Sequence, residues 1–142
     1  MTIAAILRGK GAALVTVSPE TTVAGAIALL AEHRIGALPV VTDGVVRGIF
    51  SERDVVRLLA GSDSDVLQAR VQDVMTAPAL SAAPGDAVLA ALSLMTQRRI
   101  RHLPVVEDGE LRGIVSIGDL VKFRIERIEA EAAAMRDYIQ QV

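Results

Sequence analysis

Two short stretches of this 142-residue chain pair a hydroxyl with a carboxylate at the same spacing. "SERDVV" begins at Ser51 and "SIGDLV" at Ser116, and each has an aspartate three residues later, Asp54 and Asp119. A serine at a helix start with an acid one turn later is nearly a capping box, although Glu or Gln is the usual partner. The same groups suit a ligand, because a carboxylate accepts hydrogen bonds from paired hydroxyls and helix N-terminal amides favour phosphate. Capping and binding are compatible, and we expect both.

The residues between serine and aspartate differ completely, Glu52 and Arg53 in the first stretch and Ile117 and Gly118 in the second. Arg53 is either a bidentate phosphate contact or a solvated charge. Gly118 either removes that cation or leaves room for close approach of a ligand. We therefore predict two sites with different phosphate preferences.

These stretches belong to an internal duplication with an offset of sixty-five residues. Residues 19–60 align with residues 84–125 without a gap, and 18 of the 42 positions are identical. Two copies are too few for a solenoid, so we expect them to pack against each other about a pseudo-two-fold axis.

Each copy predicts the order strand, helix, strand, strand, helix, an α/β (α+β) fold. Apolar residues at helical spacing mark the first helix of each copy: Val23, Ala26, Ile27 and Leu30, then Val88, Ala91, Leu92 and Met95. The Asp-Gly pairs at 43–44 and 108–109 predict hairpins, because both turn residues tolerate positive φ. "LVTV" and "ALSA" are the expected initial strands, and "VLQARVQDVM" between the copies is expected to form one short helix.

The C-terminal segment predicts an amphipathic helix. Its apolar residues alternate spacings of four and three: Val121, Ile125, Ile128, Ala132, Met135, Ile139 and Val142. This pattern is typical of a coiled-coil seam. The alternative is a helix that folds back on its own domain, since a seam of three heptads containing an alanine is weak.

The duplicated unit, with "LPVV", Asp-Gly and S-x-x-D in fixed order, resembles the cystathionine-β-synthase (CBS) domain, which occurs in tandem pairs called Bateman modules. The resemblance covers about residues 1–125. We place the first domain at 1–61, a linker at 62–70, the second domain at 71–125 and a helical tail at 126–142. The resemblance implies a regulatory module that binds an adenosyl ligand. AMP is the first choice and NADH or ATP come next, and S-adenosylmethionine is also known as a ligand in the family.

Carried over by position, the resemblance implies Asp54 and Asp119 as ribose-binding acids and Ser51 and Ser116 as hydroxyls near the phosphate. The other ligand-binding candidates lie on the segment entering each hairpin, on the loop before the second copy, and beside the two acids: Ile35, Gly36, Ala37, Leu38, Ile100, Arg101, His102, Leu103, Thr76, Ala77, Pro78, Arg53, Ile117 and Gly118. Arg101 or His102 could supply the cation that Gly118 lacks. A lone histidine is also commonly a structural residue.

Composition narrows the function classes. The chain has a net charge of −2, no cluster of Lys and Arg, and only 2% aromatic residues, which disfavours nucleic acid as a partner. It has no cysteine, so disulfides, thiolate metal sites and thiol nucleophiles are excluded, and a cytoplasmic location is expected. We expect no catalytic or metal site and no membrane span. "RGKG" at residues 8–11 lacks the spacing of a phosphate-binding loop, so we interpret it as a turn.

The sequence thus predicts a non-catalytic sensor of adenine nucleotides that forms a homodimer and acts on an unidentified regulated protein. One alternative is an assembly module without ligand. The other is an enzyme, which two histidines and no dense acid–base cluster disfavour.

Overall fold

The computed structural model describes residues 1–11, 14–61 and 65–141. Its elements are α1 (Ile3–Lys10), α2 (Val23–His33), β1 (Ala37–Thr42), β2 (Val45–Ser51), α3 (Glu52–Ala60), the 3₁₀ turn η1 (Val66–Gln68), α4 (Val71–Val74), α5 (Val88–Arg98), β3 (His102–Glu107), β4 (Glu110–Ser116) and α6 (Ile117–Gln140). Linker residues 62–64 and the last seam position, Val142, lie outside the described residues.

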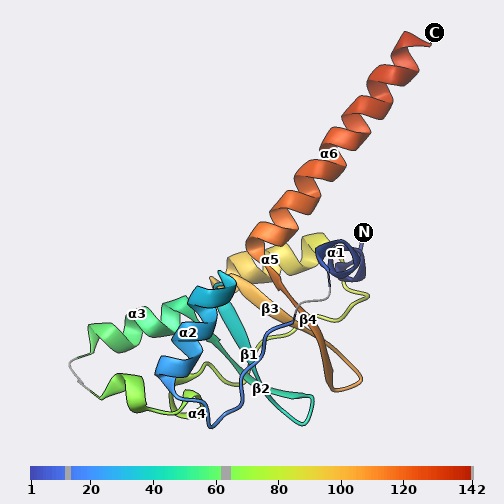
Figure 1. The fold of residues 1–142 in the computed structure, drawn as a ribbon. Helices are drawn as coiled ribbons and strands as arrows, with labels where there is room; N and C mark the ends of the chain where they lie inside the picture. The colour runs from blue at the N-terminus through green and yellow to red at the C-terminus, as the bar shows by residue number, and fades with distance from the viewer. Residues whose placement is uncertain (12–13, 62–64, 142) are drawn as a thin grey trace.

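Each copy contains the predicted antiparallel hairpin, β1–β2 in the first and β3–β4 in the second. Asp43 and Asp108 have φ of 51° and 53°, and the glycines that follow also have positive φ, as the Asp-Gly turns require. The two hairpins lie side by side at the centre of the molecule (Figure 1). The amide of Leu111 donates to the carbonyl of Gly44, which ties one hairpin to the other.

The initial strand of each copy is shorter than predicted. Val17 and Ala82 each form a single parallel bridge, to Val40 and Val105 respectively. The chain on either side of these two residues makes no further ladder in the described part of the structure. The predicted order of elements is therefore confirmed, with one paired residue in place of each first strand.

Two hydrophobic cores form, and each includes a helix from outside its own repeat. The first-repeat core gathers the apolar face of α2 and the hairpin with Val71 of α4. The second-repeat core gathers α5 and β3–β4 with Ile3 and Ile6 of α1, the N-terminal helix. The segment that precedes each repeat thus packs on the other repeat.

Two predictions about these preceding segments were wrong. "RGKG" is not a separate turn, because α1 runs through Arg8 to Lys10. "VLQARVQDVM" is not one helix, because Ala69 and Arg70 are extended between η1 and α4. There the carbonyl of Ala69 accepts from the amide of Val23, and the amide of Val71 donates to Thr21, so the start of α2 uses the backbone groups that a continuous helix would need.

The C-terminal helix α6 continues as one helix of 24 residues and extends away from the body (Figure 1). Its second half makes no return contact: Met135 and Ile139 are 61% and 64% exposed. Folding back onto its own domain is therefore wrong for the described residues.

Candidate functional site

Both S-x-x-D stretches form reciprocal capping boxes at helix N-termini. In the first, the amide of Asp54 donates to Oγ of Ser51 at 3.4 Å and the amide of Ser51 donates to Oδ2 of Asp54 at 2.9 Å. In the second, the same two bonds join Ser116 and Asp119 at 3.0 and 2.8 Å. The capping interpretation is confirmed in both copies. Glu is the usual acid at this position, but the shorter aspartate side chain also reaches the N-cap amide here.

The acid of the first copy is buried and engaged by the chain itself. Asp54 is 5% exposed. Its Oδ1 accepts a hydrogen bond from Oγ1 of Thr76 at 3.2 Å. Thr76 is held there because its backbone exchanges two hydrogen bonds with Ile49 of β2, at 2.9 and 3.0 Å. A ribose that bound Asp54 would have to compete with the Thr76 hydroxyl.

The acid of the second copy is more accessible and has a cation beside it. The side chain of Asp119 is 26% exposed, and its Oδ2 lies 2.8 Å from Nζ of Lys10. The same ammonium donates to the carbonyl of Ile114 at 2.7 Å. Burial raises the pKa of the Asp119 carboxyl, but hydrogen bonds from Lys10 and Ser116 outweigh it and hold the pKa below its ordinary value. Asp119 is therefore a carboxylate at neutral pH.

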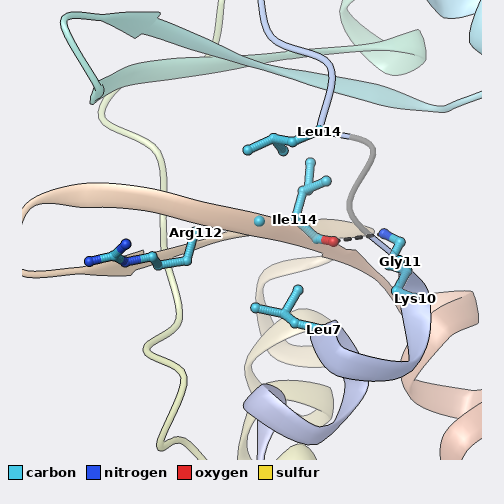
Figure 2. A pocket seen from close by; sticks show the side chains of 7 residues that line it. Leu7, Lys10, Gly11, Leu14, Arg112 and Ile114 are labelled. Carbon is cyan, nitrogen blue, oxygen red and sulfur yellow. Dashed lines mark hydrogen bonds between the residues drawn. The ribbon is translucent and has the colours of Figure 1, made fainter.

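A cavity of about 230 Å³ adjoins Asp119 between α1 and the start of α6. Its lining combines two carboxylates, those of Asp119 and Glu126, with two ammonium groups and an apolar floor: Ala5, Ile6, Gly9, Lys10, Asp119, Lys122, Phe123 and Glu126. A smaller hollow of about 70 Å³ lies on the other side of Lys10, bordered by Leu7, Leu14 and the β4 residues Arg112 to Ile114 (Figure 2). Lys10 lines both hollows.

Two predicted site residues from different copies meet at the interface between the repeats. A methyl group added at Gly36 would stand 2.9 Å from Cε1 of His102. Burial lowers the pKa of the His102 imidazole; the charge of Glu52 opposes this shift and the charge of Lys10 adds to it. His102 is thus a half-buried, neutral group between the copies.

We expect the free energy of unfolding to decrease as the pH falls below about 6.5, the pKa that His102 regains in the unfolded chain. Because folding lowers the pKa of His102, the unfolded chain binds the proton at a higher pH than the folded chain does. The free energy of unfolding therefore falls as the pH drops toward the folded pKa, and it falls no further below that pKa. Urea titrations at pH 7.5 and 5.5 measure it. The variant His102→Gln should show a smaller difference between these pH values, and an unchanged difference would contradict the assignment.

Arg53 also reaches across to the other copy. Its Nη1 donates to the backbone carbonyl of Arg99, which follows α5. The guanidinium is exposed, so this bond does not remove it from solvent. Its role as a phosphate contact stays a prediction.

Most of the remaining predicted residues occupy equivalent places in the two copies, whereas Ala77 and Pro78 lie on the loop before the second copy. Ala37, Leu38 and Leu103 are buried as whole residues, so neither their side chains nor their backbone is open to a ligand in this arrangement of the chain. The carbonyls of Gly36 and Arg101 accept from the amides of Glu52 and Ile117, at the starts of α3 and α6. The others are partly buried before the hairpins or exposed at loops and helix starts: Ile35, Ile100, Ala77, Pro78 and Gly118.

Sequence reasoning missed Lys10 and Lys122 as neighbours of Asp119. The spacing of Ile3, Ile6 and Leu7 was the available signal for a helix before "RGKG". Nothing local indicated that this helix would pack on the second repeat.

Among the described residues, no helix is long and apolar enough to cross a bilayer. Within the same residues, no group of three or more His, Asp or Glu side chains is arranged to hold a metal ion.

Comparison with known proteins finds relatives of similar length as well as longer proteins of which the chain covers only a part. The family model described as "CBS domain" matches residues 12–61 and 71–126. The CBS domain-containing protein YhcV of Bacillus subtilis is 36% identical over 118 residues, which covers 83% of this chain and 84% of YhcV. The crystal structure of the CBS-domain containing protein ATU1752 from Agrobacterium tumefaciens matches with a TM-score of 0.83 and 41% identity, covering 87% of this chain and 99% of that one. The crystal structure of CBSX2 in complex with AMP matches with a TM-score of 0.75 and 30% identity, covering 88% of this chain and 96% of that one.

Proposed function

Because this chain belongs to the CBS-domain family, we propose that it is a non-catalytic regulatory module that binds an adenine nucleotide at its paired repeats. AMP is the first choice, which the AMP complex of the similar protein CBSX2 supports, and NADH or ATP come next. A second copy of this chain and a regulated protein are the proposed partners, and we place the module in the cytoplasm, since a chain without cysteine suits a reducing compartment.

The surroundings of Asp119 are the observation that carries this proposal. An accessible carboxylate at the N-terminus of α6 can accept hydrogen bonds from both hydroxyls of a ribose. Lys10 and Lys122 line the same cavity and supply charges of the sign that phosphate needs. Lys10 would exchange its contact with Asp119 for one with phosphate, so the acid and the cation would serve the two ends of one nucleotide.

The two sites are proposed to differ. Asp54 is covered by the Thr76 hydroxyl, whereas Asp119 is paired with the Lys10 ammonium. A phosphate forms a strong, charge-assisted hydrogen bond with an ammonium group, whereas its hydrogen bond with a neutral hydroxyl is weaker. We therefore expect the site of Asp119 to prefer ligands with more phosphate charge, and the site of Asp54 to depend on Arg53 for that charge.

Thermal unfolding with a panel of ligands tests the function. We expect AMP, ADP, ATP, NADH or S-adenosylmethionine, at one hundred times its dissociation constant, to raise the free energy of unfolding by about 2.7 kcal/mol. GMP and inorganic phosphate are the controls, since they share the phosphate but lack the adenosine. No shift with any adenosyl compound would exclude the sensor, and turnover of the nucleotide during incubation would show an enzyme instead.

The second candidate is an assembly module without ligand. The observation in its favour is that Asp54 is buried and already accepts hydrogen bonds from Ser51 and Thr76. The same panel decides, because this candidate predicts no ligand-dependent shift while the chain still associates.

A further inference from the structure

The C-terminal helix α6 carries an exposed apolar stripe along most of its length. Its six described members are Val121, Ile125, Ile128, Ala132, Met135 and Ile139, which we call the α6 seam. Ile125 is 50% exposed and Ile128 is 48% exposed, although both lie in the half of α6 nearer the body. Exposed apolar residues in a row along one helix face are typical of an interface.

The α6 seam faces away from the rest of the chain. The side of α6 that meets α1 contains Asp119, Phe123 and Glu126, which line the cavity between the two helices. At about 100° per residue, Ile125, Ile128 and Ala132 lie on roughly the opposite side of the helix. The body therefore leaves the α6 seam open. Figure 1 shows the helix itself projecting from the body.

We propose that the α6 seam pairs with the α6 seam of a second copy of this chain, in a parallel two-stranded coiled coil. Ile125, Ala132 and Ile139 take the a positions of the heptads, and Val121, Ile128 and Met135 take the d positions. This interface does not depend on nucleotide binding.

Charges beside the α6 seam select both the occupant and its direction. The g positions hold Arg124 and Glu131, and the e positions five residues later hold Glu129 and Arg136. In a parallel pair each g residue meets the e residue of the next heptad on the other helix, so Arg124 meets Glu129 and Glu131 meets Arg136. Two-fold symmetry repeats both pairs. A second copy thus supplies the opposite charge at both of these g–e contacts.

An antiparallel pair fits worse. With the two seams fully overlapped, Glu129 would meet Glu129, Glu131 would meet Glu131, and Lys122 would meet Arg136, all like charges. A shift by one heptad would pair opposite charges. Depending on its direction, the shift would carry either Met135 and Ile139 or Val121 and Ile125 beyond the partner's α6 seam and leave them uncovered.

Three of the four side chains involved are exposed, and Arg124 is half-buried. Glu129 and Arg136 are exposed. Glu131 lies 3.5 Å from Nε of Arg127 on its own helix, with side chains 64% and 54% exposed. An exposed pair of this kind contributes little, so Glu131 can turn to Arg136 of the second copy without a large loss.

Two charge variants of the full chain test the interface. The acidic variant carries Arg124→Glu and Arg136→Glu, and the basic variant carries Glu129→Arg and Glu131→Arg. Each puts like charges at both g–e contacts, whereas an equal mixture restores opposite charges throughout. By sedimentation, we expect the unchanged chain to be a dimer, each variant alone to be at least tenfold more dissociated at equal concentration, and the mixture to regain the dimer. Circular dichroism checks that each variant keeps the fold.

Two results would overturn the proposal: a monomeric unchanged chain, or charge variants that each remain dimeric alone, which would place the dimer contact on the body. The direction of the two helices is tested separately with single-cysteine variants, which are suitable because the chain has no cysteine of its own. Oxidation of Ile139→Cys should cross-link a parallel dimer, since the two a positions face each other. Glu126→Cys, on the side facing α1, is the matched control and should not cross-link. A dimer that Ile139→Cys does not cross-link would refute the parallel direction.

Discussion

Replacing Ile3 with alanine is expected to lower the free energy of unfolding by about 2–5 kcal/mol, the usual cost of removing a large buried aliphatic side chain. Ile3 is fully buried in the second-repeat core. The backbone around it is also fixed, because the amides of Ile3 and Ala4 donate to the carbonyls of Asp86 and Pro84, each at 2.9 Å. The neighbours therefore have little freedom to collapse into the space left by the side chain.

Urea denaturation measures this loss, with circular dichroism as the probe. Leu89→Ala is the matched control: it removes an aliphatic side chain of the same size from α5, where Leu89 is 57% exposed, and should change stability by less than about 0.5 kcal/mol. If Ile3→Ala were as mild as this control, α1 would not be an integral part of the second-repeat core.

Replacing Asp119 with asparagine is expected to weaken the proposed adenosyl ligand at the second site by about 10- to 100-fold. Hydrogen bonds to a charged group are worth about 1.5–3 kcal/mol, and about 1.4 kcal/mol corresponds to tenfold in affinity. Asparagine keeps an acceptor for the Ser116 amide, so the cap of α6 is largely preserved. It loses the charge and one of the two acceptor oxygens that the ribose hydroxyls would use.

Isothermal calorimetry with the ligand that gives the largest thermal shift measures the affinity. Asp54→Asn is the paired comparison: both oxygens of Asp54 already accept hydrogen bonds from Ser51 and Thr76, so its loss should affect ligand affinity less. Equal losses in the two variants would remove the proposed difference between the sites. A loss only in Asp54→Asn would move the ribose acid to the first copy.

The features that sequence predicted well are those fixed by neighbouring residues. The capping boxes join residues three apart, and the hairpin turns depend on the φ tolerance of Asp-Gly, so both could be identified from the residues alone. The duplication then transferred each assignment from one copy to the other. The apolar faces of α2 and α5 followed from helical spacing in the same way.

The features that sequence missed depend on contacts between distant segments. Lys10 and Asp119 are 109 positions apart, and no local pattern brings them together. The break between η1 and α4 arises because the start of α2 binds the backbone at Ala69 and Val71, which overrides the helical preference of "VLQARVQDVM". The same kind of contact places the Thr76 hydroxyl on Asp54.

The exchange of α1 and α4 between the repeats has a consequence for the order in which the chain can fold during synthesis. The first-repeat core is complete once α4 has left the ribosome, since Val71 is its last buried member. Helix α1 is made first, yet its buried partners extend as far as Val115 and Leu120. Domains generally fold from the N-terminus as they are made. Here the earliest helix must wait, with Ile3 and Ile6 uncovered, until almost the whole second repeat has been translated.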